Sequence, residues 1–198
     1  MTTRTVEKHP APTMHRIAWL TLIALLLMAM PAWGKSKAAE QKEVKKMAGE
    51  ILAELYKVQP SAKKVVQGAA GYAVFGNFGM KIFVAGGGSG SGLAYNNKTK
   101  QTTYMKMVEI QAGLGIGIKK FKLVWVFETQ QLLDQFVNSG WELGGQTTAS
   151  AKMGDKGTGV TGAMSVSPGV WLFQLTSDGL ALELTAKGTK YYKDGDLN

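Results

Sequence analysis

The stretch GGGSGSGLAYNN, residues 86–97, decides how this chain is expected to fold. Glycine occupies every second position from 86 to 92, and a shorter repetition, GLGIGI, follows at residues 113–118. Side chains of a β-strand alternate between its two faces, so each stretch would form a strand with one bare face. A bare face allows a helix, another strand or an apolar ligand to approach closely, and it lets a sheet bend sharply. The glycines therefore predict two strands of a tightly curved sheet.

Glycine-rich stretches also cradle phosphates, but the spacing here excludes the known nucleotide-binding loops. The dinucleotide fingerprint G-x-G-x-x-G needs glycine at its sixth position. That position holds Ser91 when counted from Gly86 and Leu93 when counted from Gly88. A P-loop ends in Gly-Lys-Ser or Gly-Lys-Thr, and no lysine follows the last glycine of this stretch.

The remaining segments predict helices at three places. Apolar residues at spacings of three and four predict an amphipathic helix over residues 35–58. A second, short helix is expected over residues 62–68 with Ser61 as its cap. A third is expected over residues 130–138, capped by Thr129 and ended by Gly140.

Short β-type runs separate these helices and continue to the C-terminal part. They are broken by glycine and asparagine and lie at residues 71–78, 80–87, 92–97, 102–110, 112–118, 119–128, 163–167, 170–176 and 180–186. The polar residues 96–100 predict a hairpin turn. In residues 119–128, Leu123, Trp125 and Phe127 alternate with residues expected on the opposite face.

The predicted fold is one α+β, β-rich domain: an N-terminal amphipathic helix and a curved, mostly antiparallel sheet, barrel-like or a sandwich, with one inserted helix. The tail from Tyr191 is expected to be polar and to pack by its tyrosines alone. Its Asp194-Gly195-Asp196 segment hints at a calcium loop but lacks the remaining ligands, so we predict no metal site. Trp125 and Trp171 are expected in the core, and Trp141 at an exposed position.

Residues 1–34 have the three-part pattern of a secretory signal peptide. A basic start precedes the 14-residue apolar run IAWLTLIALLLMAM, residues 17–30, and small residues precede a cleavage site after Gly34. The run is short for a membrane span, which needs about 20 residues; an uncleaved anchor is the alternative. We expect an exported protein, residues 35–198, that is periplasmic or peripherally membrane-associated in a Gram-negative bacterium and otherwise secreted.

The composition of residues 35–198 excludes the catalytic mechanisms that depend on histidine or cysteine. The chain has no cysteine, and both histidines, His9 and His15, precede residue 35. Ser-His-Asp and Cys-His machinery and the usual zinc sites are therefore excluded. The net charge of this part is +7 (20 lysines minus 13 acidic residues), which favours anionic partners such as membrane surfaces. We expect no catalytic residue, no cofactor and no nucleic-acid partner.

Four stretches in a fixed order resemble the SYLF domain, a lipid-binding family found in bacterial exported proteins and in eukaryotic proteins of membrane traffic and actin patches. They are GAAGYAVF, VAGGGSGSGLAY, GLGIGIKKFKLVWVFETQQLLDQF and DGLALELTAKGTKYY. The resemblance covers residues 44–192. Two positions depart from it: Lys120 stands where the family often has an acidic residue, and residues 153–155 replace a frequent Gly-Pro.

What the resemblance implies is binding of phospholipids or phosphoinositides through basic surface and an N-terminal amphipathic segment, without catalysis. Actin bundling fits an exported protein poorly. The candidate lipid-binding residues are Lys42, Lys45, Lys46, Lys81, Lys119, Lys120 and Lys122. For the lysines near the start of the 119–128 strand, the alternative is a solvated strand edge. For those of the first helix, the alternatives are an interfacial helix and a helix docked on the sheet with its lysines in water.

Two other function classes compete with lipid binding. A periplasmic structural or protein-interaction module would use the same basic surface without lipid specificity. A hydrolase would need two acids, or serine and lysine, that converge on one cavity. The lipid head group, the entry of acyl chains into the fold and the oligomeric state do not follow from the sequence.

Overall fold

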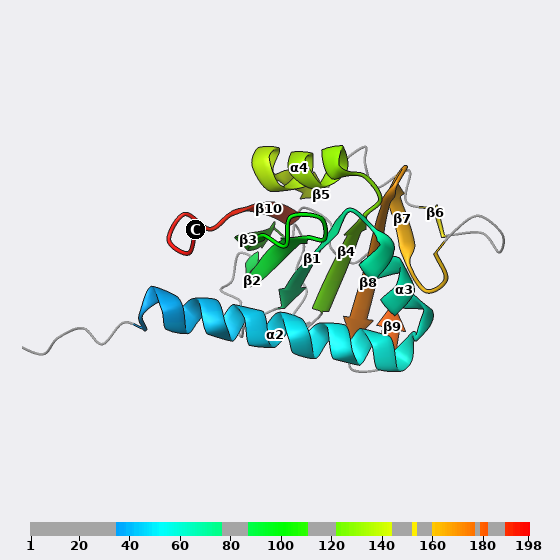
Figure 1. The fold of residues 1–198 in the computed structure, drawn as a ribbon, viewed down its shortest axis with the longest axis horizontal. Coiled ribbons are helices and arrows are strands. Elements are labelled where there is room, and N and C mark those ends of the chain that lie inside the picture. The colour runs from blue at the N-terminus through cyan, green and yellow to red at the C-terminus, as the bar shows by residue number, and fades with distance from the viewer. Residues whose placement is uncertain are drawn as a thin grey trace, which may run out of the picture. The chain divides into compact units, whose positions relative to one another are not determined.

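The computed structural model describes residues 35–76, 87–110, 122–143, 152–153, 160–176, 179–181 and 189–198. The predicted signal peptide, residues 1–34, lies outside them. The unit Ser36–Asn198 has helices on both sides of one sheet (Figure 1), with α2 on one face and α4 on the other. No helix in the described part of the chain is long and apolar enough to cross a membrane.

The first two helices cover one face of the sheet. Helix α2, Lys37–Val58, begins at Ser36, whose Oγ accepts a hydrogen bond from the Ala39 N–H at 3.3 Å. It buries five apolar side chains at spacings of three and four: Val44, Met47, Ala48, Ile51 and Leu55. The amphipathic helix is therefore confirmed, and its apolar stripe packs against the sheet.

Helix α3, Ser61–Gly68, is also present, but the predicted cap is wrong. Pro60 occupies the cap position, and Ser61 is the first helical residue. The Ser61 Oγ accepts a hydrogen bond from the Gln59 side chain at 2.7 Å instead of holding the helix N-terminus. Proline fixes its own φ near the helical value, so the helical backbone begins one residue earlier than the serine suggests.

Helix α4, Gln130–Ser139, is the predicted inserted helix. The Thr129 Oγ1 accepts a hydrogen bond from the Leu132 N–H at 3.4 Å, and Gly140 follows the helix with a φ of 68°. Both predicted ends are confirmed. Leu133 and Phe136 are the buried residues by which α4 packs on the sheet.

A single antiparallel sheet connects the described strands in the order β5-β10-β3-β2-β1-β4-β8-β7-β6, with β9 beside β8. The strands are β1 Gly71–Gly76, β2 Gly87–Asn96, β3 Thr102–Ile110, β4 Lys122–Phe127, β5 Trp141–Leu143, β6 Lys152–Met153, β7 Met164–Ser167, β8 Val170–Thr176, β9 Gly179–Ala181 and β10 Thr189–Lys193. The predicted α+β, β-rich class is confirmed. Its barrel-like alternative describes the curled sheet of Figure 1 better than a sandwich does.

The central strand β4 shows why both sheet faces are apolar. Leu123, Trp125 and Phe127 join the core beneath α4. Val124 and Val126 join the core beneath α2 and α3. The predicted alternation is confirmed, and helices cover both faces, so each β4 residue from 123 to 127 is buried.

Neighbouring side chains fill the bare face of the glycine strand. Gly90 and Gly92 of β2 are buried, and β2 pairs with β1 and β3. A Cβ added to Gly90 would lie 2.6 Å from the Met107 Cε, and one added to Gly92 would lie 2.8 Å from the Phe75 Cε1. The strand prediction is confirmed for this stretch, and side chains of adjacent strands occupy the space. The second glycine stretch, residues 113–118, lies outside the described residues.

The predicted hairpin between β2 and β3 also holds the end of α3. The Asn96 Oδ1 accepts hydrogen bonds from the Lys98 and Thr99 N–H groups, both at 2.9 Å. The Asn97 Nδ2 donates to the carbonyl oxygens of Val66 and Ala69 at 2.8 and 2.9 Å. The turn therefore satisfies carbonyls at the C-terminal end of α3 that have no partner within the helix.

The prediction that the tail from Tyr191 is polar and packs by its tyrosines alone is only partly confirmed: a tyrosine packs, but so do other residues of a strand and of the segment after it. Strand β10 lies between β3 and β5, and Tyr191 is fully buried. Asp194 and Leu197 beyond the strand are buried as well. In TKYYK, Thr189 and Tyr191 face inward while Lys190 faces solvent. The mixed composition is therefore the period-2 pattern of a strand.

Candidate functional site

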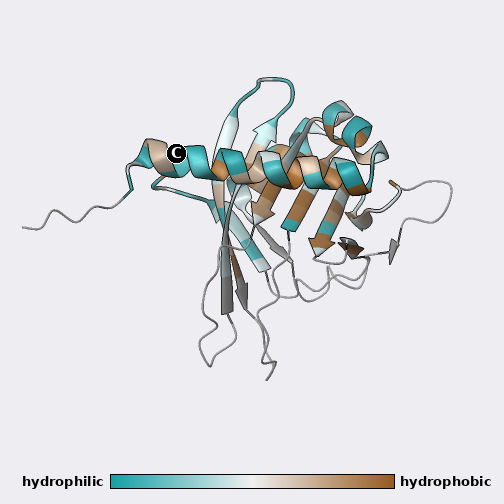
Figure 2. Ribbon diagram, turned by 90° about the horizontal axis from the view of Figure 1, so that it is seen from below, coloured by the Kyte–Doolittle hydropathy of each residue, from teal (hydrophilic) through white to brown (hydrophobic). Residues whose placement is uncertain are grey.

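The outward face of α2 gathers lysines among small residues. Lys42, Lys46, Gly49, Ala53 and Lys57 are all exposed. They are spaced by four, three, four and four residues, which places them along one face of an α-helix. Figure 2 looks onto this side of the molecule, where α2 crosses in front of the sheet with hydrophilic residues along it.

The acidic residues of α2 lie elsewhere on the helix. Glu43, Glu50 and Glu54 are spaced by seven and four residues, about a quarter turn from the exposed lysine face. The Lys46 Nζ lies 3.7 Å from the Glu50 Oε1 in a pair that is exposed on both sides. Such a pair contributes little free energy in water. The outward face therefore keeps its positive charge.

The predicted lysines differ in their surroundings. Lys42 has no ion pair within the described part of the chain. The Lys45 Nζ lies 6.0 Å from the ring centroid of Tyr104 on β3, a cation–π distance. Lys122 of β4 forms an ion pair with Glu54 of α2, so its charge is balanced at the seam between helix and sheet. Lys81, Lys119 and Lys120 lie outside the described residues.

Three further lysines extend the positive surface. Lys57 lies in the last turn of α2, and Lys63 and Lys64 lie on α3; all three are exposed. None of them has an ion pair among the residues that the structure describes. Ala62 and Val66 form the buried side of α3, and this spacing already places Lys63 and Lys64 away from the core. We call Lys42, Lys45, Lys46, Lys57, Lys63 and Lys64 the cationic face.

An apolar pocket opens beside α3. Its volume is about 380 Å³, and it is lined by Lys64, Val65, Gly68, Ala69, Val126, Glu128 and Trp171. The Trp171 indole N–H donates a hydrogen bond to the Glu128 Oε1 at 2.7 Å. Trp171 is half-buried and packs against the edge of the core beneath α2 and α3, so its predicted core position is confirmed only in part, whereas Trp125 is fully buried as predicted. Trp171 is the second residue of β8, close to the turn at residues 168–169, and a strand end is a place where one face lies open.

Two acidic residues near the C-terminal end of the described chain share one lysine. Asp194 and Asp196 both bind the Lys106 Nζ, at 2.9 and 3.0 Å. The lysine neutralises the buried Asp194, as a paired charge in a fold requires. In the described part of the chain, no three Asp, Glu, His or Cys residues gather as a metal site would need.

Comparisons with known proteins give one informative similarity. The chain is 35% identical over 151 residues to Beta cell expansion factor A of Aeromonas veronii. The alignment spans 76% of this chain and 56% of that protein, so the chain covers little more than half the length of its relative. No model of a known protein family matches the chain.

Proposed function

We propose that this chain is an exported, non-enzymatic lipid-binding protein of the SYLF type that attaches to anionic membranes through its cationic face. Residues 1–34 serve as the signal peptide, and residues 35–198 work as one domain in the periplasm or at a membrane surface. The partner is an anionic phospholipid, and binding needs no cofactor. The similarity to Beta cell expansion factor A supports a shared fold over the aligned residues.

The arrangement of α2 carries this proposal. Its apolar stripe is used for packing on the sheet, and its lysines point outward with the acids displaced to a flank. A docked helix of this kind meets a membrane as a charged surface and need not insert its apolar side. Between the two alternatives for this helix, the contacts favour the docked one.

The strength expected from such a surface is moderate. Each lysine near an anionic bilayer contributes about 1 kcal/mol, and the effect decays within a Debye length of roughly 10 Å at 0.1 M salt. Several lysines on one face therefore give moderate attachment of the protein to the membrane, and salt weakens this attachment. The apolar pocket beside Lys64 and Trp171 adds a place where part of a lipid can leave water.

Vesicle co-sedimentation of residues 35–198 tests the proposal. We expect pelleting with anionic phosphatidylglycerol vesicles, weak pelleting with neutral phosphatidylcholine vesicles, and release by salt. The double variant Lys42→Gln/Lys46→Gln should lower the partition coefficient by about 30-fold, since two lysines at about 1 kcal/mol each are lost.

A matched control separates the effect of the lysines' position from the effect of the net charge. Lys98→Gln/Lys193→Gln removes the same charge from two exposed residues that do not belong to the cationic face, one at the hairpin turn and one on β10. We expect this variant to bind nearly as the unchanged protein does. Equal losses in both variants would show that only net charge matters. Negligible pelleting with both vesicle types would favour the protein-interaction module over lipid binding.

A further inference from the structure

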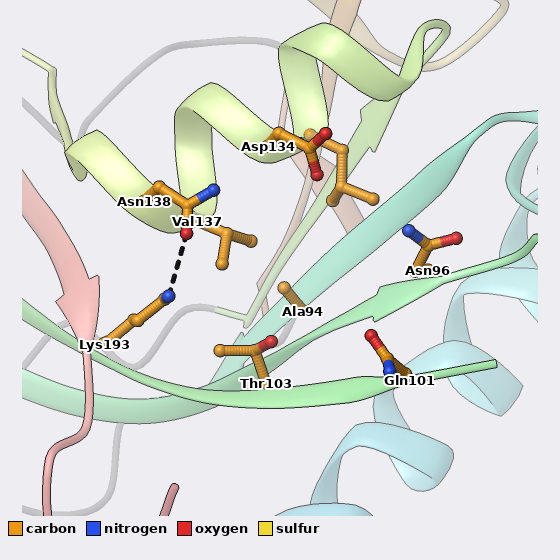
Figure 3. A pocket seen from close by; sticks show the side chains of 9 residues that line it. Ala94, Asn96, Gln101, Thr103, Asp134, Val137, Asn138 and Lys193 are labelled. Atoms are coloured by element: carbon orange, nitrogen blue, oxygen red, sulfur yellow. Dashed lines mark hydrogen bonds between the residues drawn. The ribbon is translucent and has the colours of Figure 1, made fainter. Parts of the chain in front are cut away.

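A second pocket lies on the opposite face of the sheet, between α4 and strands β2, β3 and β10. Its volume is about 260 Å³, and Figure 3 shows polar side chains that surround an open space. It is lined by Ala94, Asn96, Gln101, Thr103, Leu133, Asp134, Val137, Asn138 and Lys193. We call it the amide pocket, because three of its side chains are carboxamides.

Hydrogen bonds within the protein hold several of these side chains in place. The Asn96 Nδ2 donates to the Gln130 Oε1 at 3.1 Å, and the Gln130 Nε2 donates to the Asp134 Oδ1 at 2.8 Å. On the other side, the Lys193 Nζ donates to the Asn138 Oδ1 at 2.8 Å (Figure 3). Side chains fixed in this way are preorganised, which lowers the entropy cost of binding a ligand.

Other polar groups keep their hydrogen-bonding capacity for a ligand. Within the described residues, the side chains of Gln101 and Thr103 have no hydrogen-bond partner, although Thr103 is half-buried. Asp134 keeps its second carboxylate oxygen, and Asn138 keeps its amide N–H groups. The pocket thus offers both donors and acceptors from elements far apart in the sequence.

These groups restrict the chemistry of the ligand. Asp134 and Lys193 carry opposite charges, so the pocket as a whole favours neither an anion nor a cation. Its volume lies just below the roughly 300 Å³ at which pockets for drug-sized molecules begin. A hydroxyl both donates and accepts, so it can meet a carboxylate, an ammonium group or an amide equally well.

From these observations we infer that the amide pocket binds a neutral, hydroxyl-rich molecule of the size of one saccharide unit. Its hydroxyls would contact Gln101, Thr103 and Asp134, and its C–H face would lie on the apolar side chains of Leu133 and Val137. The site is separate from the cationic face, because α2 and α4 cover opposite faces of the sheet (Figure 1). It does not depend on lipid binding.

Nuclear magnetic resonance of ¹⁵N-labelled residues 35–198 without lipid tests this inference. The probes are methyl α-glucoside, N-acetylglucosamine and maltose. Glycine, a small zwitterion, is the control ligand. At least one sugar should move the side-chain NH₂ resonances of Gln101 and Asn138 with saturation. A Kd on the order of millimolar is expected for a ligand with so few heavy atoms.

Variants locate the binding. Thr103→Val removes one hydroxyl at nearly constant size. It should raise the Kd of the sugar by about 5-fold, which corresponds to the usual net contribution of one hydrogen bond. Asp134→Asn should raise the Kd by a similar factor, and its side-chain oxygen can still accept the hydrogen bond from Gln130. Gln135→Ala, an exposed change on α4 outside the pocket, should leave the Kd unchanged. The same spectra report whether each variant is folded.

Any of three results would overturn the inference. One is the absence of saturable shifts for all three sugars up to about 100 mM, well above the expected Kd. The second is binding of glycine alone, and the third is sugar binding that Thr103→Val and Asp134→Asn leave unchanged. Neither result bears on vesicle binding, which is measured separately.

Discussion

Lys106 of β3 binds Asp194 just beyond β10, with 2.9 Å between the Lys106 Nζ and the Asp194 Oδ1. Asp194 is only 3% exposed, whereas Lys106 is 37% exposed. Hydrogen bonds to Asp194 and then Asp196 raise the pKa of Lys106 above its usual value. The pair therefore anchors the C-terminal segment, residues 194–198, against β3.

That segment also fastens the start of α2. The Lys37 Nζ donates to the Asn198 carbonyl oxygen at 2.6 Å, and the Gln41 Nε2 donates to the Leu197 carbonyl oxygen at 2.7 Å. Asn198 in turn exchanges two hydrogen bonds with the Tyr104 backbone, at 2.9 and 2.8 Å. The C-terminal segment thus binds both the start of α2 and strand β3.

Lys106→Met should destabilise the domain by about 2 kcal/mol, because it leaves the buried Asp194 carboxylate without its charged partner. Urea unfolding followed by circular dichroism measures the change. Glu50→Ala, which removes the exposed pair with Lys46, should change stability by less than about 0.5 kcal/mol. Equal effects of the two substitutions would contradict an anchoring role for Lys106.

The glycine strand gives a second prediction about stability. Gly92→Ala should cost about 3 kcal/mol, since its Cβ would overlap the Val74 carbonyl oxygen and the Phe75 ring, whose Cε1 would lie 2.8 Å away, in a packed core. Gly49→Ala on α2 has nothing within 4 Å of the new Cβ and should stabilise the helix by about 0.5–1 kcal/mol. Thermal unfolding of both variants measures the contrast. A Gly92→Ala protein as stable as the unchanged one would mean that the bare face is not needed for packing.

Local period was enough to predict much of this fold. The alternation around Trp125, the apolar stripe of α2 and the glycine spacing at Gly90 and Gly92 each follow from neighbouring residues, and each is found. The strand character of β10 was missed because its two lysines and its acidic continuation resembled a polar tail. The distant Lys106 balances the charge of the buried Asp194, and the nearby Asp196 N–H donates a hydrogen bond to its carboxylate.

The candidate sites depend more strongly on tertiary structure. The lysines of α2 could be placed from helical spacing alone, and those of α3 by the same argument. Lys122 is predicted either to bind lipid or to lie at a solvated strand edge, yet Glu54 on another element neutralises it. The amide pocket joins β2, β3, α4 and β10. No local pattern brings Thr103, Asp134 and Lys193 together.

Tyr72 provides a prediction at high pH. Burial raises its pKa to about 12, with further contributions from the nearby Tyr56 and Tyr95. The folded state thus keeps a phenol proton that the unfolded state loses near pH 10. This group's contribution to stability is fully present below about pH 10 and is lost as the pH rises toward 12.

Comparison with Tyr72→Phe isolates this effect. The unfolding free energy of the unchanged protein minus that of the variant should be constant from about pH 7 to 9 and should fall from about pH 10 upward. Urea unfolding across this range measures it, and Lys106 contributes equally to both proteins. A difference that stays constant to about pH 11.5 would show that Tyr72 ionises as readily in the folded state as in the unfolded state.

Trp171 tests whether the apolar pocket beside α3 meets lipid. Its indole lies next to Lys64 and donates to Glu128, and amphipathic rings of this kind favour the boundary between head groups and acyl chains. Anionic vesicles with brominated acyl chains should therefore quench the tryptophan fluorescence of residues 35–198. Trp171→Phe should remove most of the quenching, while the fully buried Trp125 keeps its emission. Trp141→Phe is the matched control, and quenching that disappears with Trp141 instead would place the membrane contact at β5 and not beside α3.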